Sequence, residues 1–156
     1  MILKYVKGDA TEPIGDGKKF IIHCCNDLGL WGAGFVLAIS KKWKDPEIQY
    51  KSWFENQKNK FKLGSIQIVP VDNDISVVNM IGQSGVRNKS NPTPIKYDAI
   101  RKCLKQVAIA AKFNKASVHA PQFGSGLAGG DWGEIENIIN EELIEKNIDV
   151  TIYLFD

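Results

Sequence analysis

Two glycine-rich segments constrain the fold of this chain most strongly, because each follows an apolar, strand-like run and precedes a helical pattern. The first covers residues 25–34 and reads CNDLGLWGAG, and the second covers residues 122–130 and reads QFGSGLAGG. The succession of strand, glycine loop and helix is typical of α/β sheets, in which ligands bind at the carboxyl ends of the strands. We therefore expect both loops to lie at one edge of a sheet and to carry the function.

The apolar runs and the helical patterns alternate along the chain. Six short runs, rich in β-branched or aromatic residues, predict strands: Ile2–Val6, Phe20–Cys24, Ser65–Val69, Ser76–Ile81, Ala116–His119 and Asp149–Phe155. Three helical zones lie between them: Ala33–Trp43 continuing after Pro46 to Gln57, Pro94–Phe113, and Asp131–Lys146. This alternation predicts an α/β layered sheet with helices on both faces. No linker or internal repeat divides residues 1–156, so we expect one domain.

The composition argues against several classes of protein. No apolar run approaches the roughly 20 residues that span a bilayer, and the N-terminus shows no signal-peptide layout. We therefore expect a cytoplasmic protein without membrane contact. The net charge is +2 and the lysines are scattered, so no specific nucleic acid is expected as a partner. The three cysteines fit neither a disulfide framework nor a metal-ligand spacing, and we expect no metal and no cofactor.

The glycine loops are suited to hold phosphate groups. Glycine lets the backbone adopt positive φ and lets a ligand approach the main chain closely. Successive N–H groups in such turns converge on an anion, and the start of a helix adds a partial positive charge. Two loops of this kind at one sheet edge indicate a diphosphate held between them, the alternative being two merely tight strand–helix turns.

Two common nucleotide-binding motifs do not account for these loops. No Gly-Lys-Ser or Gly-Lys-Thr occurs, which argues against a P-loop NTPase. The run Gly124–Gly129 matches G-x-G-x-x-G, but only one helical pattern and one strand-like run follow it in the sequence. A dinucleotide-binding Rossmann unit normally needs further βα units beyond this fingerprint.

Four segments together resemble the macrodomain family and cover nearly the whole chain. They are residues 7–11 (KGDAT), residues 23–35 with their Trp31-Gly32-Ala33-Gly34 run, residues 121–132, and the terminal strand. The resemblance implies a three-layer α/β/α fold with a mixed central sheet of about six strands, and ADP-ribose or a close derivative as ligand. The H-x-C-N…W-G-x-G variant is most similar to a branch that contains ADP-ribose-1''-phosphate phosphatases and the terminal ADP-ribose protein glycohydrolase.

The resemblance also implies ligand contacts at particular positions. Asp9 would accept a hydrogen bond from the adenine amino group, with the backbone of Ala10 beside it, and Tyr153 or Phe155 would pack against adenine. Asn26 would contact the distal ribose. The diphosphate would lie between two segments, Gly32, Ala33 and Gly34 on one side and Gly124, Ser125, Gly126, Leu127 and Ala128 on the other.

Several of these residues also have a purely structural interpretation. Asp9 could organise a turn with Thr11, Asn26 could be an ordinary turn residue, and one of the two aromatic residues, Tyr153 or Phe155, could belong only to the core. The sequence leaves these alternatives open.

The catalytic candidates are His23 and Asp131. His23 ends the strand before the first loop, and the ordinary pKa of histidine, near 6.5, suits proton transfer, although a hydrogen-bonded core histidine would show the same pattern. Asp131 precedes a helix with Glu134 three residues later, which is also the pattern of a helix cap. The lysine and aspartate of the glycohydrolase align with Gln83 and Ala128, so its mechanism would need a different catalytic set.

We therefore expect a protein that binds ADP-ribose or ADP-ribose-1''-phosphate and hydrolyses it, by removing the terminal phosphate. Two alternatives stay open. One is a non-catalytic ADP-ribose-binding module, and the other is a glycohydrolase with a changed catalytic set that acts on ADP-ribosylated macromolecules.

Overall fold

The structure, a computed structural model, describes residues 2–155 without the side chain of Leu127. In chain order the elements are β1 (Leu3–Lys7), β2 (Lys19–Asn26), α1 (Phe35–Lys42), α2 (Asp45–Asn56), β3 (Ile66–Asp72), β4 (Ile75–Gln83), α3 (Tyr97–Asn114), β5 (Ser117–Pro121), the 3₁₀ turn η1 (Gly126–Ala128), α4 (Trp132–Glu142), the 3₁₀ turn η2 (Ile144–Lys146) and β6 (Val150–Leu154). No helix in the described part of the chain is both long and apolar enough to cross a membrane.

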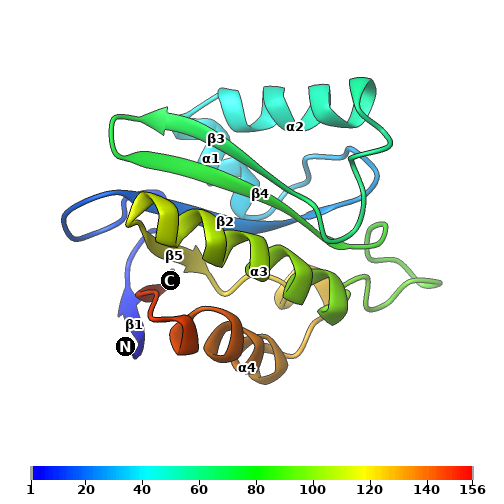
Figure 1. The fold of residues 1–156 in the computed structure, drawn as a ribbon. Helices are drawn as coiled ribbons and strands as arrows, with labels where there is room; N and C mark the ends of the chain where they lie inside the picture. Colours follow the sequence, from blue (N-terminus) through cyan, green and yellow to red (C-terminus); the bar gives the residue numbers. More distant parts are fainter. Residues whose placement is uncertain (1, 156) are drawn as a thin grey trace.

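The strands form one six-stranded sheet in the order β1-β6-β5-β2-β4-β3. All neighbouring pairs are parallel except β3 and β4, which are antiparallel, so the sheet is mixed. Helices α1 and α2 lie on one face of the sheet, and α3 and α4 lie on the other (Figure 1). The predicted three-layer α/β/α fold with a mixed sheet is confirmed.

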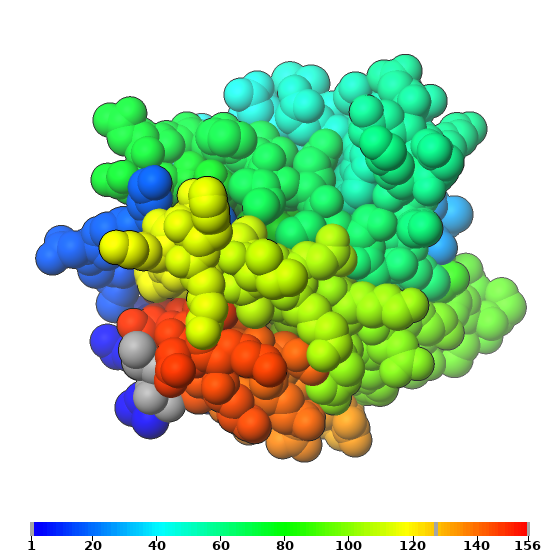
Figure 2. Space-filling view, in the orientation of Figure 1, coloured from blue at the N-terminus to red at the C-terminus, as the bar shows by residue number. Residues whose placement is uncertain are grey.

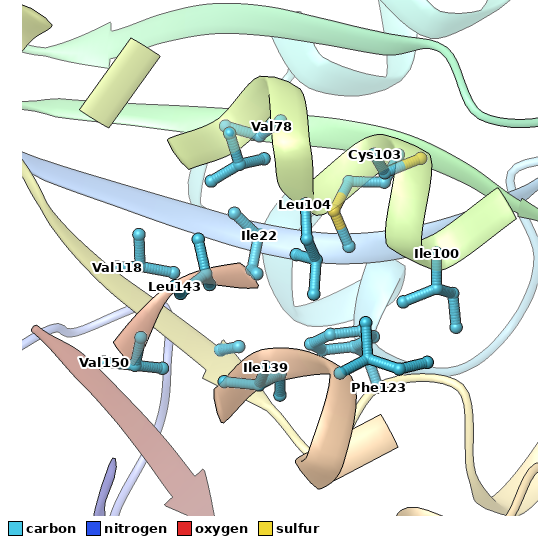
Figure 3. Close-up of a cluster of buried hydrophobic side chains, with 14 of the residues drawn as sticks. Ile22, Val78, Ile100, Cys103, Leu104, Val118, Phe123, Ile139, Leu143 and Val150 are labelled. Carbon is cyan, nitrogen blue, oxygen red and sulfur yellow. The ribbon is translucent and has the colours of Figure 1, made fainter. Parts of the chain in front are cut away.

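The central strand β2 is buried on both faces, because its neighbouring residues point into two separate cores. Ile21 packs in the cluster beneath α1 and α2, with Tyr50 and Trp53. Ile22 packs in the cluster beneath α3 and α4. Figure 3 shows the side chains of this cluster between the helices and the sheet. In the space-filling view, α3 and α4 pack side by side over one part of this face, and the residues of β3 and β4 remain visible beside them (Figure 2). Burial on both faces explains why Phe20–Cys24 shows no polar alternation.

The first helical zone differs from its prediction, because it forms two helices rather than one continuing helix. Helix α1 ends at Lys42, and Trp43 then adopts an extended conformation with φ −139° and ψ 132°. Pro46 lies in the first turn of α2, where its missing N–H costs no helical hydrogen bond. Proline therefore marks a new helix start here. The other predicted elements are confirmed, with ends that shift by a few residues.

Candidate functional site

The carboxyl ends of β2, β4 and β5 meet at one edge of the sheet and surround a cavity of about 450 Å³. Both glycine loops line it, as the sequence predicts. The lining consists of residues 23–26, 31–36, 83, 86–87, 121–125 and 128. Of the predicted ligand-binding residues, Asn26, the Gly32–Gly34 run, Gly124, Ser125 and Ala128 lie on this cavity, while Gly126 lies beside it in η1. Leu127 also lies in η1, and its side chain lies outside the described part.

The first loop presents the start of α1 to the cavity. Gly34 is the N-cap of α1 and no side chain caps this helix, so its first N–H groups have no side-chain acceptor. Residues 32–36, which contain these N–H groups, all line the cavity. An uncapped helix start combines unpaired N–H donors with a partial positive charge, and both favour an anion.

The second loop adds backbone donors from the opposite side. Its internal hydrogen bonds run from the N–H of Gly129 to the carbonyl of Gly126 and from the N–H of Gly130 to the carbonyl of Gly124. Within the described residues, the N–H groups of Gly124 and Ser125 donate to no protein acceptor. Gly124 has φ 77°, a left-handed conformation that favours glycine. The loop therefore keeps its shape and leaves donors for a ligand.

Asn26 organises the first loop. Its Oδ1 accepts hydrogen bonds from the N–H of Leu28 at 2.9 Å and from the Tyr50 hydroxyl at 3.0 Å. Its Nδ2 donates to the carbonyl of Leu30 at 2.6 Å. These contacts are those of the turn-organising alternative, and the predicted contact with the distal ribose stays a prediction.

Replacing Asn26 with alanine is expected to lower the free energy of unfolding by about 2–3 kcal/mol, because the N–H of Leu28 and the carbonyl of Leu30 both lose their partner, while the Tyr50 hydroxyl keeps the carbonyl of residue 26 at 2.7 Å. Tyr50→Phe is the matched control, since it removes only the hydroxyl that donates to Asn26. It is expected to cost about 1 kcal/mol. Denaturant unfolding measures both values. Equal losses would show that the tyrosine bond, rather than the asparagine side chain, holds the loop.

The residues predicted to hold adenine lie at the ends of β1 and β6, outside the 450 Å³ cavity but on the same sheet edge. Asp9 Oδ1 accepts from both the N–H and the hydroxyl of Thr11, at 2.8 and 2.7 Å, and Ala10 is buried beside it. Tyr153 is buried, and its hydroxyl accepts from the N–H of Ile14 at 3.0 Å. Phe155 is 79% exposed, so it offers the accessible aromatic surface of the two.

His23 is buried beneath the first loop. Asn79 Nδ2 donates to Gln67 Oε1 and to the carbonyl of Pro46, so Asn79 Oδ1 is the acceptor that faces His23. His23 Nε2 therefore carries the proton and donates to Asn79 Oδ1 at 2.5 Å. Burial lowers the pKa of His23 to about 4, so the ring is neutral at pH 7. These contacts explain a core histidine, and a catalytic role stays a prediction.

Asp131 caps helix α4. Its Oδ1 accepts from the N–H of Gly133 at 2.9 Å. The reciprocal half of a capping box is missing, because the N–H of Asp131 donates to the Tyr97 hydroxyl instead of to Glu134. Asp131 is not among the residues that line the cavity, so the structure does not bring it together with His23.

Arg87, which is not among the residues predicted from the sequence, lines the cavity from the loop between β4 and α3. Its Nη1 donates to the carbonyl of Gly126 at 3.2 Å, so this arginine connects two loops that are 39 residues apart. The 83–92 segment has no hydrophobic period, and a single arginine in it carries no sequence signal of its own.

Comparison with solved structures identifies close relatives over the whole chain. A macrodomain protein from Streptomyces coelicolor is 45% identical with a TM-score of 0.88, covering 98% of this chain and 99% of that chain. A Bacteroides thetaiotaomicron protein of unknown function is 55% identical with a TM-score of 0.94, covering 98% of each chain. Thermosipho africanus DarTG in complex with ADP-ribose is 15% identical with a TM-score of 0.68 over 88% of this chain and 38% of that chain, a likeness of fold alone.

Among curated proteins, the chromodomain-helicase-DNA-binding protein 1-like of Danio rerio is 31% identical over 163 residues, covering 98% of this chain. The matched region is only 16% of that protein, so this chain corresponds to a small part of it. The ADP-ribose 1''-phosphate phosphatase of Lodderomyces elongisporus is 25% identical over 166 residues, which cover 100% of both chains. No protein-family model matches the sequence.

Proposed function

Because this chain belongs to the macrodomain family, we propose that it binds ADP-ribose or a derivative in the cavity between its two glycine loops. The observation that carries this proposal is the meeting of two sets of backbone donors across one cavity. The uncapped start of α1 lies on one side, and the N–H groups of Gly124 and Ser125 lie on the other. Neutral donors fixed by the fold suit a diphosphate, which needs several hydrogen bonds at once.

The activity we propose is hydrolysis of ADP-ribose 1''-phosphate to ADP-ribose and inorganic phosphate. Two observations support it: the phosphatase of Lodderomyces elongisporus matches this chain from end to end, and the cavity of about 450 Å³ is large enough for part of such a ligand. The de-ADP-ribosylating alternative has less support, since Gln83 and Ala128, which stand at its two catalytic positions, both line the cavity without a charge.

A second candidate function is that of a binding module without catalysis. His23 favours it, because a buried ring with a pKa of about 4 is a weak base at neutral pH. Cys24 also favours a binding module, because burial raises the pKa of its thiol to about 12 and leaves little thiolate to act as a nucleophile. Asp131, the other candidate, is engaged as a helix cap outside the cavity lining.

Placing a carboxylate on the cavity wall is expected to weaken ligand binding. Ala33 is exposed and lines the cavity beside the start of α1, so Ala33→Glu should lower ADP-ribose affinity at least tenfold by repelling the diphosphate. Leu37→Glu is the matched control. It adds the same charge four residues later, in the first turn of α1 at an exposed position outside the cavity lining, and should leave the affinity within about twofold. Calorimetric titration with ADP-ribose measures both.

Phosphate release separates the two candidates. Wild-type protein at micromolar concentration is incubated with ADP-ribose 1''-phosphate, and free phosphate is measured over time. Release above the protein-free rate supports the phosphatase. Binding of ADP-ribose without release supports the binding module. If neither ADP-ribose nor ADP-ribose 1''-phosphate binds, both candidates are wrong.

A further inference from the structure

Arg87 gives the cavity its charge. Among the described residues that line the cavity, it is the only one with a formally charged side chain, since the lining contains no aspartate, glutamate or lysine. The side chain is solvent-exposed and is held by one hydrogen bond to a neutral carbonyl, that of Gly126 at 3.2 Å. A guanidinium gains more from a phosphate than from a carbonyl, because both partners are then ionised and the contact can be bidentate.

The backbone that carries Arg87 is fixed, although the side chain is exposed. The N–H of Gly85 donates to Asp27 Oδ1 at 2.8 Å, which ties this segment to the first loop. The N–H of Ser84 donates to the carbonyl of Pro94 at 2.9 Å, and Asn91 Nδ2 donates to the carbonyl of Ser84 at 2.8 Å. Arg87 thus has a defined place at the cavity mouth, in the loop that extends beyond β4 in Figure 1.

The sheet order places Arg87 at the far end of the proposed ligand. Across the sheet, the carboxyl ends follow each other as β1, β6, β5, β2 and β4. Asp9 follows β1, the two glycine loops follow β5 and β2, and the Arg87 loop follows β4. Neighbouring strands lie about 4.8 Å apart, so the distance from β1 to β4 is roughly 19 Å. A ligand with adenine at Asp9 and its diphosphate between the glycine loops therefore has its other end at Arg87.

We propose that Arg87 is a specificity-determining residue that binds the terminal phosphate of ADP-ribose 1''-phosphate, exchanging its hydrogen bond to the Gly126 carbonyl for bonds to that phosphate. This inference rests on the proposed function. The site would then select a ligand with a third phosphate over ADP-ribose, because backbone N–H groups bind the diphosphate and the Arg87 guanidinium binds the terminal phosphate.

The test compares the two ligands on matched variants. Arg87→Ala is expected to weaken binding of ADP-ribose 1''-phosphate about tenfold or more, and binding of ADP-ribose less than threefold. Arg87→Lys should recover only part of the loss, since it restores the charge without the bidentate contact. Lys89→Ala removes a charge from the same loop but outside the cavity lining, and should change neither affinity. Stopped-flow mixing provides the affinities before turnover intervenes.

The outcomes distinguish this inference from the function on which it rests. If the wild-type protein binds neither ligand, the proposed function itself is wrong. If it binds both, and Arg87→Ala weakens both by the same factor or weakens neither, the function stands and the role of Arg87 is overturned. An equal effect of Lys89→Ala and Arg87→Ala on the phosphate ester would also overturn it, because long-range charge would then suffice. Raising the salt concentration should reduce the preference for the ester in the wild type and not in Arg87→Ala.

Discussion

Replacing Gly129 with alanine is expected to lower the free energy of unfolding by about 3 kcal/mol and to weaken ADP-ribose binding at least tenfold. Gly129 ends the 3₁₀ turn η1 with φ 72°, where a side chain strains the backbone. An added Cβ would also lie 2.7 Å from the carbonyl oxygen of Pro92 and 3.3 Å from the Cα of Thr93. Both atoms belong to the backbone, so the glycine loop itself must move, and with it the donors that face the cavity.

Gly17→Ala is the control that separates strain from steric contact. Gly17 has φ 80°, close to that of Gly129, but an added Cβ there would meet nothing within 4 Å. It should cost about 1–2 kcal/mol and leave ADP-ribose affinity unchanged, because it lies in the β1–β2 connection away from the cavity lining. Urea unfolding and calorimetry measure the two quantities. Equal losses of unfolding free energy in the two variants would show that the close packing of η1 against residues 92–93 does not stabilise the protein.

The layered fold was predictable because its signals are local. Each predicted strand is a short run of apolar residues with clear boundaries, and burial of β2 on both faces left a continuous apolar pattern. The break between α1 and α2 was the exception. Trp43 and Pro46 lie only three residues apart, and the helical period resumes so quickly that the pattern resembles one long helix. A proline at the first turn of a helix is the signal that separates the two.

The cavity was predictable only in its backbone parts. Glycines predict a phosphate loop because a backbone with positive φ favours glycine, as at Gly124. The roles of side chains are harder to predict. A histidine on a buried strand gives the same sequence pattern whether it faces a ligand or an asparagine. His23 both lines the cavity and contacts Asn79, which lies 56 residues later in the sequence, and no local pattern predicts this contact. Arg87 was missed for the same reason, since its contact with Gly126 spans two loops.

Acidification is expected to destabilise the protein by roughly 4 kcal/mol between pH 7 and pH 5. The sequence contains two histidines, and burial lowers the pKa of both to about 4. In the unfolded chain each titrates near pH 6.5. Between pH 6.5 and 4 the unfolded state therefore binds more protons than the folded state, so stability falls as the pH falls. By pH 5 each histidine contributes a loss of roughly 2 kcal/mol.

The hydrogen bonds explain why neither folded histidine accepts a second proton easily. The Tyr153 hydroxyl accepts from the N–H of Ile14, so its own proton is directed to His119 Nδ1 at 2.7 Å. His119 Nε2 then donates to Ser117 Oγ at 2.8 Å. Protonating Nδ1 would place its N–H opposite the O–H of Tyr153, so that two donors face each other in the core. The same Tyr153 hydroxyl binds the N–H of Ile14 and so holds the connection after Asp9 in place. His23 is similar, because among the described residues its Nδ1 has the Cys25 sulfur, at 3.8 Å, as its one side-chain contact within hydrogen-bond reach.

The two carboxylates with shifted pKa values, Glu47 and Glu142, do not contribute in this pH window. The pKa of Glu47 is lowered, chiefly by its hydrogen bond to Lys51, and the pKa of Glu142 is also lowered despite desolvation, because it pairs with Arg101 and Lys105. Because their pKa values are lowered, both groups stay ionised between pH 7 and pH 5. Replacing His119 with glutamine keeps a polar group in place without a titrating ring, and should halve the slope of unfolding free energy against pH. An unchanged slope would mean that His119 titrates normally in the folded protein, and that the Tyr153–His119–Ser117 chain opens to solvent.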